Sequence, residues 1–480
     1  MTNSIIHQYL EPVIEKLVEN MENLYLQTFS NQDIEISKFF HSINEITNEL
    51  ARDATTVLLE RKDYDLCKNG QLQREGYTLK DYRSRTLTTT YGAVTFMRSY
   101  WLDSETKESF IPLDTLFLIP KRKRFDVGIR SDLAQKATML GSYNKVAQEC
   151  DFGISPTSIR NFVLEIHDEL ESREIDFVEK TENCPKTIYV EADEDHIKVR
   201  GGKSKFLKLV YVHEGYEEDS SGRRKLRNPW FIAGLYPGRA NERLWQKVSN
   251  YITTRYGNDV TVIYSSDGGR WLQAGLDWLP NCTQVLDLFH AAQACSKITK
   301  GVDNLEWTED KNPALLCALH GDLTGFQAIV DQSLSREDIS DKQKKMIKEQ
   351  ALYIEEHLEN LKPYDLGVTP GDSTEGHVSH CLSARCSSRP MTWSQKGIDA
   401  LIMVRMMCYN GVDILDFRRK ELVNTRKKLR NDRLIKLDRR KLKKYKSQNT
   451  KYHEALQVKV STDNPRLQTL IHNIWNIKLS

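Results

Sequence analysis

The sequence of 480 residues is 39% hydrophobic and 28% charged, with a formal net charge of +2. Its length predicts about three domains, and its composition is that of a globular protein with a buried core, which excludes a chain that is mainly disordered. No window reaches the ~18 uninterrupted apolar residues of a membrane-spanning helix, and the first ten residues lack the basic and then apolar order of a signal peptide. We therefore expect a cytosolic protein with no membrane partner, in which the nine cysteines are reduced thiols.

The amino-terminal part of the chain changes from a helical to a β pattern. Residues 1–80 are predicted to form a helical region, because apolar side chains recur there at helical spacing. Residues 82–101 are rich in Thr, Tyr, Val and Phe around Tyr91 and Gly92, which is typical of a β-hairpin. We assign this hairpin to a DNA-binding region of residues 81–175.

The same region contains the pattern of a helix-turn-helix. A short helix is predicted at 143–150, Gly153 lies in the turn, and Ser155 with Pro156 forms the N-cap and first position of a second helix. Such units place their second helix in the major groove of DNA. A helical hairpin with a purely structural role has the same pattern and stays an alternative. The candidate DNA contacts are Lys145, Ser158 and Arg160.

Acidic residues follow the predicted strands in the middle of the chain. The run from Thr187 leads to Asp193, the run Val260–Tyr264 leads to Asp267, and Gln284–Leu286 leads to Asp287, with His290 three residues later. Further strands are expected at 206–212 and 229–235, joined by a polar hairpin loop at 214–227. Open α/β sheets usually hold their sites where strands end, so we expect these acids to meet at one edge.

Clustered carboxylates at a sheet edge suit metal-dependent chemistry on phosphodiesters. Two divalent cations ~4 Å apart can activate the attacking oxygen and stabilise the leaving oxygen of an in-line displacement. Carboxylate oxygens are the ligands that Mg²⁺ takes, and Mn²⁺ is an equal candidate. Asp193 and Asp267 are the first two candidate ligands. Asp195 lies on the same face of its strand as Asp193 and is an alternative first ligand.

A third acidic residue follows a predicted helical insertion. Residues 301–370 are rich in Lys, Glu, Leu and Gln, which predicts helices that interrupt the sheet domain. The sequence after them, from Gly371 to His380, predicts a capped helix start with Glu375 in its first turn. A Glu at such a position can also be no more than a favourable partner of the helix dipole.

Several of these segments resemble the DDE transposases, and most closely the bacterial ISLre-type insertion-sequence family, which is related to Mutator elements. The resemblance covers nearly the whole chain. It is carried by Tyr189–His196, Ser266–Gly268, Leu286–His290 and Glu375–His380, with Ser387–Pro390 after them.

The resemblance implies an RNase H-like catalytic core with a mixed sheet, formed by residues 185–300 and 371–415 of a multidomain protein of the α+β or α/β class. It implies that Asp193, Asp267 and Glu375 bind two Mg²⁺ or Mn²⁺ ions. Asp287 and His290 would match the Asp-x-x-His motif of the family beside this site, and Arg389 is a further candidate DNA contact.

The implied activity is cleavage of phosphodiesters at the ends of an insertion sequence and transfer of the strand into target DNA. The partners would be double-stranded DNA, as terminal inverted repeats and as target. Because two element ends must be held together, a homodimer or a larger synaptic complex is expected, located with the bacterial nucleoid.

Residues 416–480 form a predicted basic helical tail. Between Arg418 and Lys446 only Glu421, Asp432 and Asp438 oppose many Lys and Arg residues, which suggests a polyanionic partner or a solvated helix. Two other functions stay open, a DNA-binding regulator without catalytic activity and a nuclease that does not join strands. A zinc site formed by His377, His380, Cys381 and Cys386 is a poor alternative, because structural zinc usually draws ligand pairs from separate segments.

Overall fold

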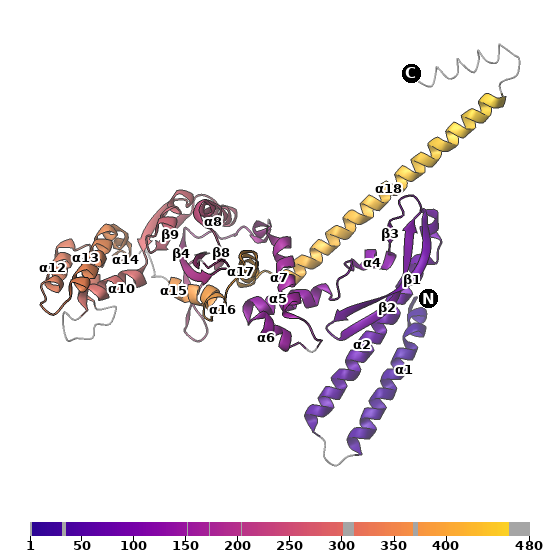
Figure 1. The fold of residues 1–480 in the computed structure, drawn as a ribbon, viewed down its shortest axis with the longest axis horizontal. Helices are drawn as coiled ribbons and strands as arrows, with labels where there is room; N and C mark the ends of the chain where they lie inside the picture. The colour runs from indigo at the N-terminus through magenta and orange to yellow at the C-terminus, as the bar shows by residue number, and fades with distance from the viewer. Residues whose placement is uncertain are drawn as a thin grey trace, which may run out of the picture. The chain divides into compact units, whose positions relative to one another are not determined.

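The computed structural model divides the chain into two compact units. One unit contains residues 1–128 and 416–480, and the other contains residues 129–415 (Figure 1). The predicted helix-turn-helix segment therefore belongs to the second unit, together with the sheet. The structure describes residues 2–30, 35–150, 152–171, 173–202, 204–300, 312–367 and 373–459.

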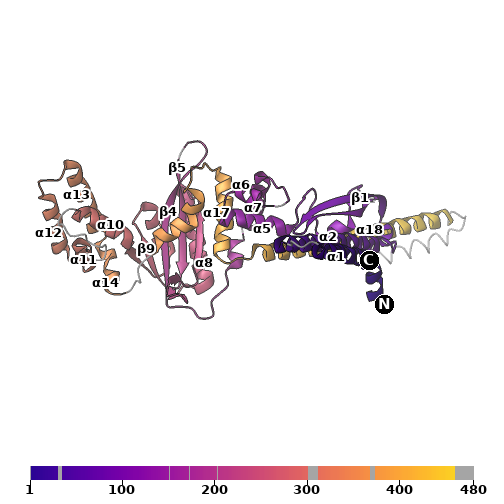
Figure 2. The same ribbon diagram turned by 90° about the horizontal axis from the view of Figure 1, so that it is seen from below.

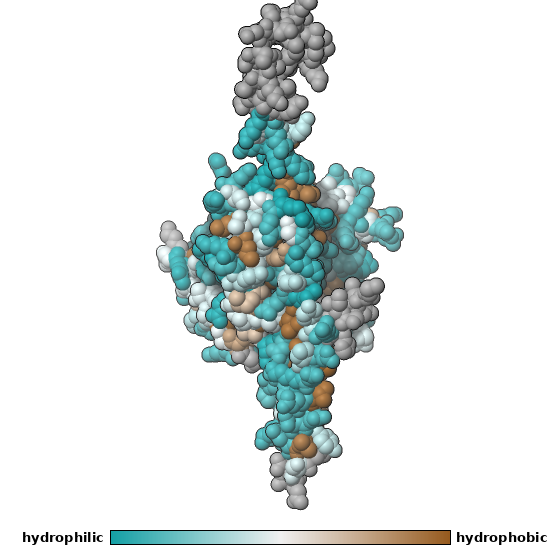
Figure 3. All heavy atoms as spheres, turned by 90° about the vertical axis from the view of Figure 1, so that its right-hand side faces the viewer, coloured by the Kyte–Doolittle hydropathy of each residue, from teal (hydrophilic) through white to brown (hydrophobic). Residues whose placement is uncertain are grey.

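The first unit contains the predicted N-terminal helices and hairpin. Its elements are α1 (Thr2–Phe29), α2 (Ile36–Cys67), α3 (Gln71–Arg74), β1 (Tyr77–Thr89), β2 (Gly92–Asp103), β3 (Ser109–Phe110), α4 (Pro112–Phe117) and α18 (Ile414–Lys459). Strands β1 and β2 pair antiparallel, which confirms the hairpin. Helix α2 is fixed to it by the buried Asp63 carboxylate, which accepts hydrogen bonds from the backbone N–H of Ser99 at 2.8 Å and from its hydroxyl at 3.1 Å. Most of the face of the molecule drawn in Figure 3 is hydrophilic.

The basic segment is helical to Lys459, and its last predicted residues, 460–480, lie outside the described part. Some of its cationic side chains form ion pairs within the first unit. Arg440 and Lys436 contact the carboxylate of Asp103, and Arg433 pairs with Glu75. Burial would raise the pKa of Asp103, but these two cations hold it well below its usual range. One side of α18 is therefore occupied by intramolecular ion pairs.

The second unit is built on a five-stranded mixed sheet in the order β10-β9-β4-β5-β8. Strands β10, β9 and β4 run parallel, whereas β5 and β8 are antiparallel to their neighbours. The predicted mixed sheet is thus confirmed. The strands are β4 (Thr187–Lys198), β5 (Ser204–His213), β8 (Trp230–Gly234), β9 (Thr261–Ser266) and β10 (Cys282–Leu286).

Strand β4 differs from the prediction, because it continues five residues beyond Asp193. Asp193 is therefore not at the end of a strand. The extension exists because β4 pairs with β5 as far as Lys198, whereas its pairing with β9 stops at Glu191. The predicted polar loop between β5 and β8 also contains two short strands, β6 (Tyr216–Glu218) and β7 (Arg224–Leu226).

Helices cover both faces of this sheet (Figures 1 and 2). On one face, Ile188, Val190 and Ala192 of β4 pack in a core with Trp245 and Val248 of α8. The other face is covered by α15, α16 and the π-helix η6. The helices on the two faces are α8 (Asn241–Tyr256), α15 (Thr374–His377), η6 (Val378–Ser383) and α16 (Ala384–Cys386). The second unit also contains the short helices η1 (Glu174–Phe177), η2 (Gly238–Ala240), α9 (Arg270–Gln273) and η3 (Leu276–Trp278).

The predicted helical insertion is present between β10 and α15, although residues 301–311 and 368–372 lie outside the described part. It has a hydrophobic core of its own, in which Phe326 and Ile354 are fully buried. Its elements are α10 (Leu288–Thr299), α11 (Pro313–Leu319), α12 (Leu323–Leu334), α13 (Asp341–Glu356), η5 (Leu358–Asn360) and α14 (Lys362–Asp365).

Helices α5 (Val127–Met139), α6 (Tyr143–Gln148) and α7 (Pro156–Leu170) precede the sheet, and α17 (Gln395–Tyr409) packs against α7 and β8. Two buried arginines join α5 to the end of the unit. Arg405 donates to the carbonyl oxygens of Thr138 at 2.5 Å and Cys381 at 2.7 Å, and Arg385 donates to that of Ala137 at 3.0 Å. The carbonyls of Ala137 and Thr138 lie in the last turn of α5, where no backbone donor of that helix reaches them.

None of the helices in the described part of the chain is both long enough and apolar enough to cross a membrane.

Candidate functional site

The pairing of the parallel strands places three aspartates at one level of the sheet. Glu191 is opposite Ser265 in the β4–β9 pair, so Asp193 and Asp267 each follow two residues later. Ser266 is opposite Leu286 in the β9–β10 pair, so Asp267 and Asp287 are also aligned. Adjacent strands are about 4.8 Å apart. The structure therefore brings Asp193, Asp267 and Asp287 together at the carboxyl ends of β9 and β10.

Asp193 lies on the face of the sheet opposite α8. Its neighbours Val190 and Ala192 point into the core with α8, and side chains alternate along a strand. Burial is the main cause that raises the pKa of Asp193 to about 6, and Asp267 and Asp287 raise it further. The backbone N–H of Glu194, at 2.7 Å from Oδ1, and the imidazole of His290 act in the opposite direction.

Asp287 and His290 form a pair beside these carboxylates. Asp287 is buried and is the N-cap of α10, where its carboxylate accepts the backbone N–H of His290 at 3.2 Å. The imidazole Nδ1 lies 3.3 Å from the same carboxylate oxygen but is not aligned for a hydrogen bond, so we treat the contact as an ion pair. The contact with Asp287 raises the pKa of His290 to about 9 despite burial, with smaller effects of Asp193 and Asp267. The contact with Asp287 therefore favours the protonated imidazole.

The loop that carries Asp267 is held by the helical insertion. The phenol of Tyr353 on α13 donates to the backbone carbonyl of Asp267 at 3.0 Å, and the N–H of Gly269 donates to its carboxylate at 2.9 Å. Gly268 has a φ of +83°, and a Cβ at this position would lie 2.5 Å from Nε2 of His357. Neither Tyr353 nor His357 could be predicted from the sequence, because both lie in a helical pattern far from the acids in the chain.

Glu375 lies in the first turn of α15, as predicted, and its side chain is exposed. Among the described residues, only His167, Asp168 and Glu171 have three ligand atoms mutually within 4.8 Å. The ligand atoms of Asp193, Asp267 and Glu375 are therefore not all within 4.8 Å of one another. Asp195, the alternative first ligand, already accepts a hydrogen bond from the hydroxyl of Ser387 at 2.6 Å.

The candidate DNA contacts have different environments. Lys145 is exposed on α6, 3.8 Å from Glu149, and Arg389 is exposed in the segment before α17. Ser158 is half-buried, with its hydroxyl 2.9 Å from that of the N-cap Ser155. Arg160 is half-buried on the side of α7 that faces Gly397 of α17. The predicted turn is present, with Gly153 at a φ of +58° and Pro156 at the first helical position.

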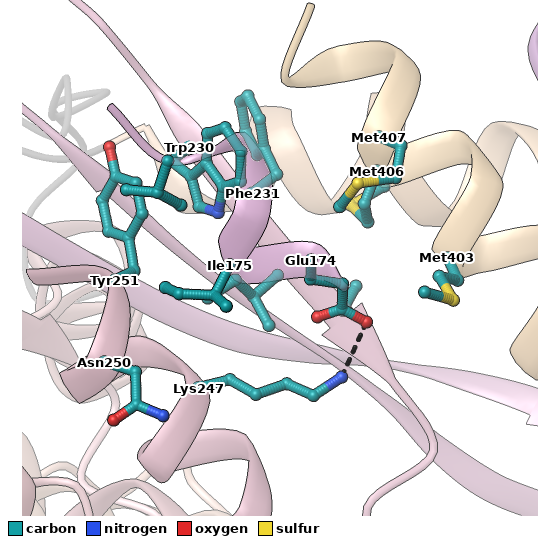
Figure 4. Close-up of a pocket in the computed structure, with 13 residues that line it drawn as sticks. Glu174, Ile175, Trp230, Phe231, Lys247, Asn250, Tyr251, Met403, Met406 and Met407 are labelled. Atoms are coloured by element: carbon teal, nitrogen blue, oxygen red, sulfur yellow. Dashed lines mark hydrogen bonds and ion pairs between the residues drawn. The ribbon is translucent and has the colours of Figure 1, made fainter. Parts of the chain in front are cut away.

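Two other features of the second unit do not form the site. In the cluster of His167, Asp168 and Glu171 only the two carboxylates are exposed, and Lys396 lies 3.5 Å from that of Asp168. A cavity of about 70 Å³ lies between α8, β8, η1 and α17, where Lys247 and Glu174 form an ion pair of 2.8 Å (Figure 4). It contains none of the aligned aspartates.

The predicted zinc alternative also finds no support among the described residues. Cys381 and Cys386 are buried, and His377, His380 and these two cysteines do not form a group with ligand atoms close to one another. The imidazole of His377 lies 2.9 Å from the backbone carbonyl of Ser373 instead.

Comparison with known proteins identifies relatives of similar length. A protein of Caldanaerobacter subterraneus subsp. tengcongensis, whose name joins eleven locus designations of that organism, is 30% identical over 417 residues, which cover 84% of each chain. A protein of Streptococcus gallolyticus, named for the vanSb 3' region, is 24% identical over 398 residues, which cover 78% of this chain and 84% of that protein. The uncharacterised protein family UPF0236 matches residues 30–425. The chain therefore belongs to the UPF0236 family.

Proposed function

We propose that this protein is a DNA transposase with an RNase H-like core, in which Asp193, Asp267 and Glu375 are the metal-binding carboxylates. The observation that carries the proposal is that Asp193 on β4 lies at the same level as Asp267 and Asp287, which directly follow the adjacent parallel strands β9 and β10. Structural acids are rarely grouped in this way, because like charges at such separations repel one another. Burial is the main cause that raises the pKa of Asp193, and Asp267 and Asp287 raise it further.

The donor set fits hard divalent cations. Every candidate ligand is a carboxylate, and the strongest charged neighbours of Asp193 are two anions and one cation, His290. Bound Mg²⁺ or Mn²⁺ would supply activation of the attacking oxygen and stabilisation of the leaving oxygen in phosphodiester exchange. Asp193 and Asp267 would hold the ions from the sheet, and Glu375 from α15.

The protein's own residues would act around this centre. His290 is 30% exposed, and its contact with Asp287 favours the protonated imidazole, which would contact a phosphate oxygen as a cation. Asp287 would keep it charged and oriented. Tyr353 and His357 would fix the loop of Asp267, so the helical insertion would be required for the geometry of the site.

The names of the relatives support the proposal that the protein is encoded by a mobile element. One relative is named with eleven locus designations of a single organism, and another with four. A sequence that copies itself within a genome is expected to occur at many loci.

DNA would be bound by the segment α6–α7, as a helix-turn-helix, and by cations of α18 that have no ion-pair partner among the described residues, such as Arg439 and Lys443.

The test is cleavage and strand transfer on labelled element-end DNA with Mg²⁺ or Mn²⁺. We expect activity in the native chain and loss of at least about a hundredfold in Asp193→Asn, Asp267→Asn and Glu375→Gln, with DNA binding retained. Asp195→Asn is the matched control and should keep most of the activity.

Each other outcome has a defined meaning. Cleavage without joined products would identify a nuclease. DNA binding by the native chain without cleavage under either cation would identify a regulator. Loss of activity in Asp195→Asn but not in Asp193→Asn would assign the first ligand to Asp195.

A further inference from the structure

We propose that Glu191 is a positioning residue for Glu375, which it holds in place by binding the first residues of α15. This inference rests on the proposed function, because it concerns the placement of a proposed metal ligand. Glu191 lies on β4, two residues before Asp193 and on the same face of the strand. It therefore links the strand of one carboxylate to the helix of another.

Five donors from three parts of the chain surround the Glu191 carboxylate. On Oε2 it accepts the backbone N–H of Ser373 at 2.8 Å, the hydroxyl of Thr374 at 2.9 Å and the phenol of Tyr211. On Oε1 it accepts Nε2–H of His213 at 2.9 Å and the phenol of Tyr216 at 3.2 Å.

The side chain is almost completely buried, with 2% of its surface exposed. Both oxygens of the buried carboxylate accept hydrogen bonds, so the group is fully satisfied.

The start of α15 depends on this carboxylate. Its N-cap residue, Ser373, makes no hydrogen bond from its own side chain to the helix. Instead its hydroxyl lies near the phenols of Tyr211, at 3.2 Å, and Tyr216, at 3.1 Å, which also donate to Glu191. Glu191 accepts the backbone N–H of this N-cap residue, which is the contact that a Glu at the third helical position makes in a capping box, so here a residue from the sheet makes it instead.

Glu375 has no comparable contacts of its own. Its exposed side chain makes no hydrogen bond or ion pair with another described residue. Its position is therefore set by the backbone of α15, and the backbone is tethered to β4 through Ser373 and Thr374. Loss of the tether would let Glu375 move relative to Asp193 without removing any carboxylate from the site.

The experiment measures Mn²⁺ binding to the full-length protein by isothermal titration calorimetry, so that no DNA or catalysis is involved. We expect Glu191→Gln to weaken Mn²⁺ binding about tenfold, which is the size of effect that residues supporting a metal ligand usually have. In the background of Glu375→Gln the same change should have almost no further effect, because Glu191 acts through Glu375.

A second pair of variants guards against misfolding of Glu191→Gln. Thr374→Val keeps the shape of the side chain but removes its donor, and Thr374→Ser restores the hydroxyl. We expect weaker Mn²⁺ binding in Thr374→Val and near-native binding in Thr374→Ser, with thermal unfolding of all variants measured alongside.

The outcomes separate the two proposals. If the native chain binds no Mn²⁺, or if Glu375→Gln binds it as tightly as the native chain, the proposed site itself is wrong and this inference falls with it. If Glu375→Gln binds more weakly but Glu191→Gln and Thr374→Val bind like the native chain, only the positioning role is refuted. A loss that is equally large with and without Glu375 would show that Glu191 acts on the fold in general, which also refutes it.

Discussion

Asp193→Asn is expected to stabilise the folded protein at neutral pH while it removes activity. Burial and the neighbouring carboxylates raise the pKa of Asp193 from 3.8 to about 6. Between these pH values the folded state holds a proton that the unfolded state has released. The free energy of unfolding therefore falls as the pH rises through this window and stays reduced above it.

The magnitude follows from the two pKa values. At about 1.36 kcal/mol per pH unit, the difference between 3.8 and about 6 corresponds to at most about 3 kcal/mol. Because solvent reaches part of the side chain, we expect Asp193→Asn to gain about 1–3 kcal/mol. The neutral amide avoids both the burial of charge and the repulsion by Asp267.

The assay is thermal unfolding of the native chain and the variant without divalent cations, at about pH 4 and about pH 7.5. The variant should unfold at a higher temperature at the higher pH, and the difference should shrink at the lower pH. Asp195→Asn is the matched control, and it should not gain stability because its carboxylate accepts a hydrogen bond from Ser387. If Asp193→Asn is less stable than the native chain at about pH 7.5, Asp193 is not a destabilising charge and the electrostatic argument for the site fails.

Three further changes test other parts of the structure. Gly268→Ala should lower the free energy of unfolding by about 1–3 kcal/mol in denaturant titrations, because of its positive φ and the close imidazole, whereas Gly376→Ala, which has open space around it, should have little effect. Arg405→Met should lower the free energy of unfolding by about 3–5 kcal/mol in the same titrations, because it leaves buried carbonyls unpaired. Arg389→Met should change it by no more than about 0.5 kcal/mol, and equal effects of the two variants would contradict the role of Arg405 as a donor to buried carbonyls. The raised pKa of His290 stabilises the fold below pH 6.5, and this contribution should be lost as the pH rises to about 9, so His290→Gln should flatten the stability profile in that window.

The sequence predicted the elements of the fold well where the pattern is local. Thr187–Val190 and Thr261–Tyr264 lie in strands because β-branched residues suit a buried sheet, and Ser155 with Pro156 begins a helix because both residues satisfy its first turn. The alignment of Asp193, Asp267 and Asp287 follows from strands that run parallel, so it could be expected from the order of the elements.

Contacts between distant segments could not be predicted in this way. Nothing in the local pattern around Glu191 distinguishes it from Glu194, yet Glu191 is buried among donors from β5 and α15. Strand β4 extends past Asp193 only because β5 pairs with it. In the same way, the sequence indicates that α18 is basic but not that Arg440 forms an ion pair with Asp103. Such pairings depend on tertiary packing, which composition and spacing do not contain.

The two buried arginines of the second unit determine how the protein can be divided for biochemical work. A fragment that begins at the first strand of the sheet would lack α5, and the guanidinium groups of Arg385 and Arg405 would lose the carbonyls of Ala137 and Thr138. A buried cation that loses its partners destabilises a fold by several kcal/mol, so a fragment cut in this way is expected to aggregate. The shortest fragment that keeps every partner of these arginines begins before α5 and ends after α17, and truncations for expression or crystallisation are best placed at those two points.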